Sequence, residues 1–299
     1  MVNILLIALG ILIALLAIVS FVLARFSVSI RRRSPEDSRR WLSERLSLDF
    51  YDRLEKTDYT VKSYDGYTLH AQWIKNPSAD GRYVLITHGY TDNHIGSLKY
   101  AKMYLDLGFH VIVWDLRGHG LNEPTYCTYS IRESRDLKAM ILDSRRRFQD
   151  IRLMGLHGES LGSATSAAVL RYKPPVDFAV LDCGFSEIAS VMRHGLRMWH
   201  LPGWLAGLAS CWVKALYGWR YGEMRPVDAL AGNTVPLLLI HGAADDFIPP
   251  RHSEDMKNAT AGYAELRLIE NAGHAASVLT APDEYSACVK DFLTKIGAL

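Results

Sequence analysis

The sequence IRLMGLHGESLG at residues 151–162 joins an apolar strand pattern to a helical pattern that begins at Leu161. Gly158 and Gly162 fit a turn at which the strand and the helix pass too close together to leave room for a Cβ atom. A turn of this kind aims the Oγ atom of Ser160 away from the sheet. The sequence therefore predicts a nucleophilic serine between a strand and a helix, provided that the surrounding chain supplies the rest of such a fold.

Short, almost continuous apolar segments separated by helical patterns lie on both sides of this turn. Strands buried on both faces read this way, and helices between them indicate a mostly parallel sheet covered on both sides. Two alternating segments around Asp65-Gly66, a preferred type I′ turn pair, predict an antiparallel hairpin at the start of this α/β fold. The predicted strands are 59–64 and 68–74 in the hairpin, then 83–87, 111–114, 151–156, 178–181, 237–240 and 266–269, with helices at 131–148, 161–172 and 285–295.

Residues 2–23 form an apolar run that only Asn3, Gly10 and Ser20 interrupt. As a helix of about 22 residues the run reaches roughly 33 Å, enough to cross a hydrocarbon core of about 30 Å. We therefore predict a single-pass membrane anchor over residues 1–24. The competing interpretation is a cleaved signal peptide, but the run is longer than a usual signal-peptide core and no Lys or Arg precedes it.

Basic residues gather just after the apolar run, although the formal net charge of the chain is only +2. The positive-inside rule then places the body of the protein in the cytoplasm, and it faces outward only if membrane insertion overrides this charge bias. Because acids and bases are nearly balanced over the chain, no global field favours nucleic acid as a partner. The local cluster consists of Arg25, Arg31, Arg32, Arg33, Arg39 and Arg40.

Residues 25–57 are predicted to form a basic linker that contains a short helix, ahead of a globular domain at 58–299. Ser34 reads as an N-cap followed by proline at the first helical position. Apolar residues such as Trp41 and Leu42 then recur at helical spacing. This helix either lies on the bilayer surface or packs on the globular domain, and the sequence supports the two alternatives equally.

One connection, between Asp182 and Pro236, is too long for a simple loop. It contains four of the seven tryptophans of the chain, mixed with Leu, Met and Ala. We predict a helical cap insertion at residues 184–235, over the carboxyl edge of the sheet. Most of these tryptophans are expected to pack the cap, and a minority to line an apolar substrate cleft. They are Trp199, Trp204, Trp212 and Trp219.

A nucleophilic serine needs a base to remove its proton, and the base needs a carboxylate to orient it. Asp245 follows the strand predicted at 237–240, and His274 follows the strand predicted at 266–269. The chain order of serine, aspartate and histidine is the order found in α/β-hydrolases. Asp246, next to Asp245, is the competing candidate for the acid.

Two further motifs follow the first predicted parallel strands. His88-Gly89-Tyr90 follows the first predicted parallel strand, and the sequence DLRGHG at 115–120 follows the next. With the serine turn and the acid and histidine loops, they make residues 59–299 resemble the α/β-hydrolase superfamily. The likeness is to membrane-anchored bacterial hydrolases related to the serine aminopeptidases and the prolyl oligopeptidase group.

The resemblance implies a role for each residue of the site. Ser160 is expected to be the nucleophile, His274 the general base and then acid, and Asp245 the residue that holds the imidazole tautomer. Asp245 is preferred to Asp246 because the family places the acid four residues after the histidine of the strand-end His-Gly. The backbone N–H groups of Tyr90 and Leu161 are expected to form the oxyanion hole.

The remaining polar residues near the strand ends are expected to be structural. Arg117 and Asp115 are predicted to brace their loop, whereas Glu159 is expected either to be a solvated charge or to bond the cap. Histidines that precede a glycine near a strand end are expected to tie loops together through their ring nitrogens. They are His88, His119, His157 and His241.

Neither a metal nor another cofactor is predicted. The His and Asp residues form no closed ligand set, and no glycine-rich phosphate loop follows a first strand. The four cysteines are far apart and have no metal-ligand spacing, so they are expected to be ordinary small buried residues that leave the redox compartment open. They are Cys127, Cys183, Cys211 and Cys288.

These features together predict a membrane-anchored serine hydrolase that cleaves carboxylic esters through an acyl-enzyme, with an apolar acyl group favoured. The expected partners are a small-molecule ester or acyl substrate and the membrane that holds the N-terminal helix; the sequence makes no prediction of oligomeric state. The alternative is a serine peptidase, either an aminopeptidase or prolyl oligopeptidase-like, which needs an anionic anchor for a peptide amino terminus. A third possibility, a non-catalytic binding protein with the same fold, is disfavoured by the complete serine, aspartate and histidine set.

Overall fold

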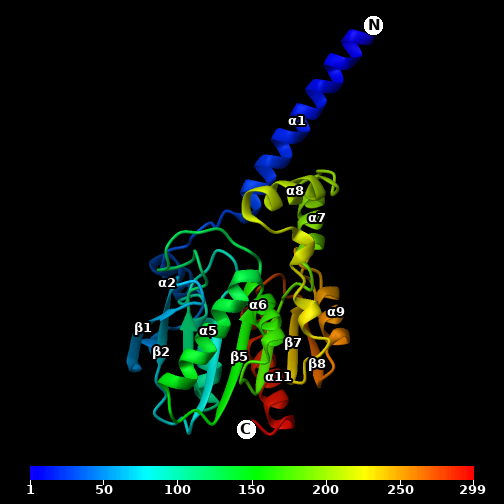
Figure 1. The fold of residues 1–299 in the computed structure, drawn as a ribbon. Coiled ribbons are helices and arrows are strands. Elements are labelled where there is room, and N and C mark those ends of the chain that lie inside the picture. Colours follow the sequence, from blue (N-terminus) through cyan, green and yellow to red (C-terminus); the bar gives the residue numbers. More distant parts are fainter. The chain divides into compact units, whose positions relative to one another are not determined.

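An eight-stranded sheet, in the order β1-β2-β4-β3-β5-β6-β7-β8, organises the computed structural model, which describes residues 1–299 (Figure 1). Strand β2 pairs antiparallel with β1 on one side and with β4 on the other, and all remaining pairs are parallel. This confirms the predicted α/β architecture with a mostly parallel sheet. The strands are β1 (Lys56–Lys62), β2 (Thr68–Ile74), β3 (Arg82–Thr87), β4 (His110–Trp114), β5 (Leu153–Glu159), β6 (Phe178–Asp182), β7 (Leu237–Gly242) and β8 (Ala264–Ile269).

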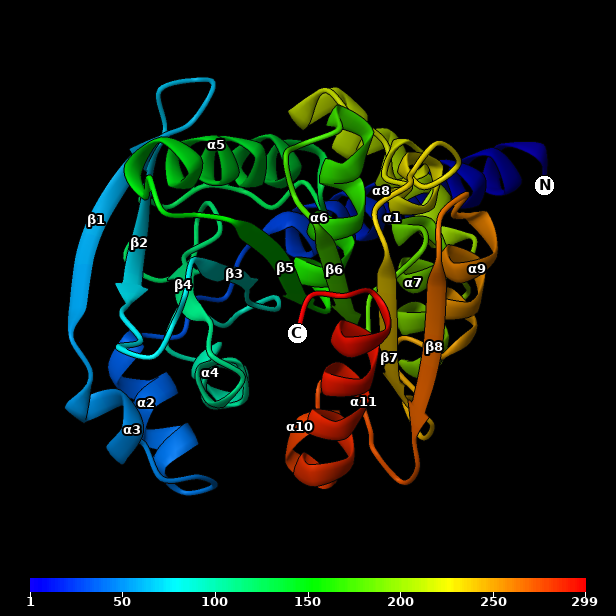
Figure 2. The same ribbon diagram turned by 90° about the horizontal axis from the view of Figure 1, so that it is seen from below.

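Helices cover both faces of the sheet. Figure 2 shows α5 and α6 on one face, and α4 with α10 and α11 on the other. The α-helices are α1 (Val2–Val28), α2 (Pro35–Ser43), α3 (Asp49–Arg53), α4 (Leu98–Asp106), α5 (Ile131–Arg147), α6 (Leu161–Val169), α7 (Ile188–Met198), α8 (Leu205–Tyr217), α9 (Arg251–Ala259), α10 (Ser277–Thr280) and α11 (Pro282–Lys295). Short 3-10 turns are η1 (Leu170–Tyr172), η2 (Tyr221–Glu223) and η3 (Pro226–Ala229).

The central strands are buried on both faces, as their continuous apolar sequences predict. Every residue of β4, β6 and β7 is buried. The prediction is wrong for β8, where only Ile269 is buried and Leu268 is exposed. The reason is position, since β8 pairs only with β7 and forms an edge of the sheet.

The short helix α2 packs on the sheet domain. Ser34 caps it as predicted, accepting a hydrogen bond of 3.0 Å from the N–H group of Asp37. Leu42 is fully buried in the main hydrophobic core, and Trp41 packs against the same core. Of the two alternatives that the sequence left open, packing on the domain is therefore the one observed.

The hairpin between β1 and β2 has the predicted strands but not the predicted turn. A two-residue type I′ turn requires positive φ at both central residues, and only Gly66 has it, at 83°. The N–H group of Gly66 donates to the carbonyl of Ser63 over 3.0 Å, and the N–H group of Ser63 donates to Tyr67 over 2.8 Å. These bonds define a longer loop of three residues that ends with a glycine in the left-handed conformation.

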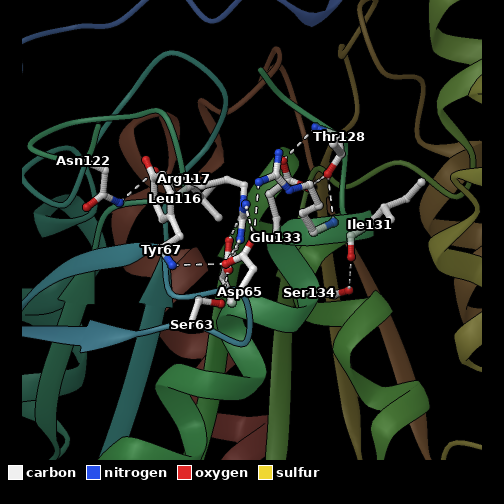
Figure 3. Close-up of polar contacts among 12 residues, drawn as sticks. Ser63, Asp65, Tyr67, Leu116, Arg117, Asn122, Thr128, Ile131, Glu133 and Ser134 are labelled. Atoms are coloured by element: carbon white, nitrogen blue, oxygen red, sulfur yellow. Dashed lines mark hydrogen bonds and ion pairs between the residues drawn. The ribbon is translucent and has the colours of Figure 1, made fainter. Parts of the chain in front are cut away.

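A buried arginine braces the loop that follows β4 (Figure 3). The guanidinium group of Arg117 is fully buried and forms two hydrogen bonds with the carboxylate of Asp136 on α5. It also contacts Asp65 of the hairpin loop, with 3.2 Å between Nη1 and Oδ2. The bracing role predicted for Arg117 is thus confirmed: one side chain ties the hairpin, the β4 loop and α5 together.

The chain divides into two compact units. One contains residues 30–186 and 225–299, which carry the sheet and the helices around it. The other contains residues 1–29 and 187–224, which carry α1, α7 and α8. Helix α1 is the one helix long and apolar enough to cross a membrane, with a mean hydropathy of 3.1 over its most apolar 18 residues.

In the smaller unit, α1 packs through its C-terminal part on α8 (Figure 1). Ser20, Ala24 and Val28 follow one another at intervals of one turn on α1, and all three are buried. Because Ser20 and Ala24 have small side chains, the two helices can approach closely. The indole N–H group of Trp212 donates to the Oγ atom of Ser20 over 3.1 Å. The ring of Trp212 meets that of Phe21 edge to face at 5.4 Å.

Candidate active site

Ser160 lies on a strained turn between β5 and α6. Its φ of 52° and ψ of −111° fall outside the regions that L-residues normally occupy, a strain of about 1–3 kcal/mol. A Cβ atom on Gly158 would overlap with the carbonyl of Gly162, and one on Gly162 would overlap with the carbonyl of Thr87. Both glycines are therefore required by the close approach of strand and helix, as the sequence predicts.

The structure brings Ser160, His274 and Asp245 together from three separate loops. The Oγ atom of Ser160 lies 2.9 Å from Nε2 of His274. The Nδ1 atom of the same ring lies 2.7 Å from Oδ2 of Asp245. Asp245 is buried, whereas its neighbour Asp246 is exposed. The arrangement makes a continuous hydrogen-bonded chain from a hydroxyl through an imidazole to a carboxylate.

The Asp245 carboxylate is held in place from several sides. Its Oδ1 atom accepts hydrogen bonds from the backbone N–H groups of Phe247, over 3.0 Å, and Ile248, over 2.9 Å. Its Oδ2 atom also lies 3.2 Å from Nε2 of His241. Burial on its own raises the pKa of Asp245, but the hydrogen bonds from His241 and His274 outweigh it and hold that pKa well below the usual value. Asp245 is therefore ionised at neutral pH.

A glycine lets the acid loop and the histidine loop meet. A Cβ atom on Gly242, the last residue of β7, would overlap with the carbonyl of Ala272. The N–H group of Ala244 donates to that same carbonyl over 3.0 Å, which ties the two loops. The backbone has positive φ on both sides of His274, at Asn271 and Ala275. These contacts fix the direction in which the His274 ring points.

Tyr90 and Leu161, the expected oxyanion-hole donors, follow neighbouring parallel strands. Thr87 of β3 pairs with Gly158 of β5, so each donor comes three residues after a paired position. Leu161 opens α6, where a first-turn N–H group has no partner within the helix. The chain just before Tyr90 lies against the serine, since a Cβ atom on Gly89 would stand 3.5 Å from that of Ser160.

A buried cluster of charged residues lies directly behind the serine, and sequence analysis missed it. Glu159 is buried, and its carboxylate pairs with the ammonium group of Lys99 on α4. The Lys99 ammonium also lies 3.3 Å from the carbonyl of Ala275, the residue after His274. The cluster thus links the serine turn to the histidine loop. Both alternatives proposed for Glu159, a solvated charge and a bond to the cap, are wrong.

Two carboxylates in this cluster share one hydroxyl proton. The Tyr100 hydroxyl lies 2.5 Å from Oε2 of Glu159 and 2.9 Å from Oδ2 of Asp182. Tyr285 donates to the same Asp182 oxygen over 3.1 Å. Burial, and then the nearby charge of Glu159, raise the pKa of Asp182 to about 6. The only sequence signal for this cluster was Lys99, a charged residue among the apolar positions of its helix.

The strand-end histidines bear out the predicted loop contacts only in part. His119 bonds within its own loop, to the carbonyl of Arg117, and His157 bonds to a helix, so the prediction is wrong for these two. His88 accepts from the N–H group of Leu116 over 2.9 Å and so joins the loops after β3 and β4. His157 lies 3.0 Å from the hydroxyl of Tyr104. Burial lowers the pKa of His119 and of His157 to about 3, so both are neutral at physiological pH. No group of three or more His, Cys, Asp or Glu residues is placed to hold a metal ion.

A parallel sheet with a serine turn after one strand, an acid after a later strand and a histidine after the last defines the α/β-hydrolase class of folds. The sequence model of the alpha/beta hydrolase family matches residues 84–287. This chain therefore belongs to the alpha/beta hydrolase family.

Several known proteins are similar to this chain. The chain is 28% identical over 298 residues to the uncharacterized protein YqkD of Bacillus subtilis, covering 98% of this chain and 97% of that one. The esterase Pf2001 of Pyrococcus furiosus superposes with a TM-score of 0.67 at 23% identity, covering 84% and 96% of the two chains. An acylaminoacyl peptidase of Pyrococcus horikoshii gives 0.63 at 14% identity, covering 83% of this chain and 42% of that one. At these identities the two solved structures support the fold alone.

The buried pair of Lys99 and Glu159 is expected to stabilise the protein strongly. Lys99→Met leaves a buried carboxylate without its cation, which costs about 3–5 kcal/mol in the free energy of unfolding. The double variant with Glu159→Gln removes the charge as well and is expected to be more stable than the single variant. Denaturant unfolding of the detergent-solubilised protein measures both.

The matched control for this pair is Lys102→Met on the same helix, where the lysine forms an exposed pair with Asp106. It is expected to change the free energy of unfolding by less than about 0.5 kcal/mol. Equal losses for the Lys99 and Lys102 variants, or a double variant no better than Lys99→Met, would contradict the interpretation.

Asp182 is expected to make the protein less stable as pH rises through the weakly acidic range. Its pKa is about 6 in the folded protein and about 4 when unfolded, so between these values the folded state holds a proton that the unfolded state has released. The contribution of Asp182 to the free energy of unfolding is therefore complete below pH 4 and is lost as pH rises through 6. Asp182→Asn removes this loss, so the stability of the variant relative to wild type should rise between pH 4 and pH 7.5 by about 1–3 kcal/mol.

The measurement is the melting temperature of both proteins across that pH range. Asp106→Asn, at an exposed position on α4, serves as the control and should follow the wild-type curve. Parallel curves for wild type and Asp182→Asn would show that Asp182 does not titrate in this range.

Proposed function

We propose that the protein is a membrane-anchored serine hydrolase that cleaves carboxylic esters with an apolar acyl group. The observation that carries the proposal is the hydrogen-bonded chain from Ser160 through His274 to Asp245, with distances of 2.9 Å and 2.7 Å. A serine hydroxyl is a weak nucleophile, and a base in contact with it, oriented by a fixed carboxylate, activates it.

The first half-reaction forms an acyl-enzyme. His274 takes the hydroxyl proton at Nε2 while the Oγ atom of Ser160 bonds to the acyl carbon. Asp245, ionised by its hydrogen bonds, keeps the proton on Nδ1 and stabilises the imidazolium. The N–H groups of Tyr90 and Leu161 stabilise the developing oxyanion, a contribution of roughly 3–4 kcal/mol per donor.

Protons and bonds balance over the two half-reactions. His274 returns its proton to the alcohol oxygen as the bond between the acyl carbon and that oxygen breaks. Water then gives a proton to His274 and bonds to the acyl carbon, and Ser160 leaves with the proton restored. The products are the alcohol and the carboxylic acid.

The charges of the cap residues favour an ester over a peptide with a free amino terminus. Residues 187–224 contain four Lys or Arg residues but only two acids. Both acids are paired, Glu187 with Arg193 over 3.4 Å and Glu223 with Lys214 over 3.0 Å. Behind the serine, Glu159 is paired with Lys99. Each of these three carboxylates thus already has a cationic partner, with which a peptide amino terminus would have to compete.

The packing of α1 supports an anchor that is retained in the mature protein. The guanidinium group of Arg25 donates to the hydroxyl of Tyr217 over 2.9 Å, and the hydroxyls of Ser27 and Tyr221 lie 2.5 Å apart. Cleavage of a signal peptide would remove these contacts and expose the α8 surface beneath them. The arginines that follow α1 favour a cytoplasmic catalytic domain.

Ser160→Ala is expected to abolish covalent labelling by a fluorophosphonate probe, because the probe bonds only to an activated serine. Ser163→Ala, which removes a buried hydroxyl one turn along α6, is the control and should leave labelling intact. Failure of the wild-type protein to label would favour the non-catalytic alternative.

The same preparations test the substrate class. We expect hydrolysis of acyl esters to rise with acyl chain length, and aminoacyl arylamides to be poor substrates. Preference for acetyl esters would remove the apolar acyl group from the proposal. Hydrolysis of the arylamides alone would favour a peptidase.

A reporter enzyme that works only in the cytoplasm is expected to be active when it is fused after Leu299, since the basic residues follow the apolar helix. Paired fusions, one to an enzyme active only in the cytoplasm and one to an enzyme active only outside it, measure the side directly. Activity of the second fusion alone would reverse the orientation.

A further inference from the structure

Helix α8 presents an apolar surface where a water-facing helix would be polar. Its exposed residues are Gly207, Leu208, Cys211, Lys214, Ala215 and Leu216, of which only Lys214 is charged. The prediction that all four cysteines are buried is therefore wrong for Cys211, which lies on this open face of α8. Trp204, at the start of the helix, is 58% exposed, and Leu216, near its end, is 44% exposed. A helix that is apolar all round is normally enclosed by protein or by lipid.

The length of α1 places α8 at the depth of the bilayer. Residues 1–15 are exposed, and Leu16 is the first residue of α1 that packs on the apolar cluster of the smaller unit. Fifteen residues of helix reach about 22 Å, which is short of a hydrocarbon core of about 30 Å. To span the core, α1 must also use residues 16–23, and these lie in the part of the helix that packs on α8.

Aromatic and cationic residues near the end of α1 match the chemistry of a membrane interface. Trp199 is 59% exposed and lies 5.7 Å from the ring of Phe26. Arg193 and Arg197, on α7, are also exposed. Tryptophan is enriched at the headgroup level, and arginine and lysine reach toward headgroups from apolar surroundings.

We propose that α8, with Trp199 and Trp204, is embedded in the bilayer. It lies in the leaflet that contains the C-terminal end of α1. The occupant of the apolar surface is lipid: acyl chains contact Leu208, Leu216 and Trp204, while phospholipid headgroups contact the cationic residues of α7. The inference rests on the proposed membrane anchor. It makes residues 187–224 a membrane-embedded insertion whose lipid contacts add to those of α1.

Lipid contact is measured with the full-length protein in nanodiscs of phosphatidylcholine and phosphatidylglycerol, one copy in each disc. After Cys211→Ser and Cys288→Ser, an environment-sensitive fluorophore is attached at Leu216→Cys. Leu142→Cys, on α5 and 41% exposed, is the matched control, and Leu9→Cys reports the anchor. Phosphatidylcholine with nitroxides on its acyl chains is the quencher, and thermal unfolding checks that each variant is folded. If Leu216→Cys is unstable, Leu208→Cys replaces it.

We expect emission from position 216 to be blue-shifted and quenched, as emission from position 9 is, with position 142 unquenched. Quenching at 9 without quenching at 216 would overturn this inference and leave the anchor intact. Absence of quenching at 9 would overturn the anchor, and the inference with it. A blue shift at 216 without quenching would show that protein, not lipid, covers α8, and would also overturn the inference.

Discussion

The close approach of α6 to the ends of β3 and β5 is the constraint on which the candidate site depends. Gly158 and Gly162 leave no room for a side chain, because each faces backbone atoms of a neighbouring segment. The turn between them holds Ser160 in a strained conformation with positive φ. That strain persists because the buried strand and helix on either side fix the backbone. A second such approach, at Gly242, lets the histidine loop reach the acid loop.

Around this crossing, the carboxyl edge of the sheet holds several buried acidic residues and one buried lysine, and each forms a hydrogen bond or an ion pair. Asp245 is stabilised as an anion by two backbone N–H groups and two histidines. Asp182, at the end of the neighbouring strand β6, accepts from the Tyr100 hydroxyl that Glu159 also contacts, and its pKa is raised. Burial thus prevails at Asp182, whereas hydrogen bonding prevails at Asp245, and the pKa values of the two carboxyl groups shift in opposite directions. Of the two, only Asp245 contacts the imidazole of His274.

The smaller unit gives the N-terminal helix a structural role in addition to the anchoring role proposed for it. Small residues of α1 lie against α8, and the Trp212 indole is bonded to Ser20. An anchor that merely tethered a soluble domain would need no such contacts. The packing of α1 instead makes the inserted segment part of the same unit, and the apolar face of α8 extends the surface that lipid is proposed to cover.

The sequence by itself determined the strands, the major helices and the loops that carry Ser160, Asp245 and His274, because each depends on local periodicity or on glycines at fixed spacing. Tertiary structure alone decided the contacts between distant segments. The pairing of Lys99 with Glu159, the contact of Asp245 with the His274 ring, and the packing of α2 on the core all join residues far apart in the chain. The partial exposure of β8 follows from its edge position, which the order of strands in the sheet fixes. Local sequence sets the conformation of a segment, but the partner of a buried charge is set by which segments the fold brings together.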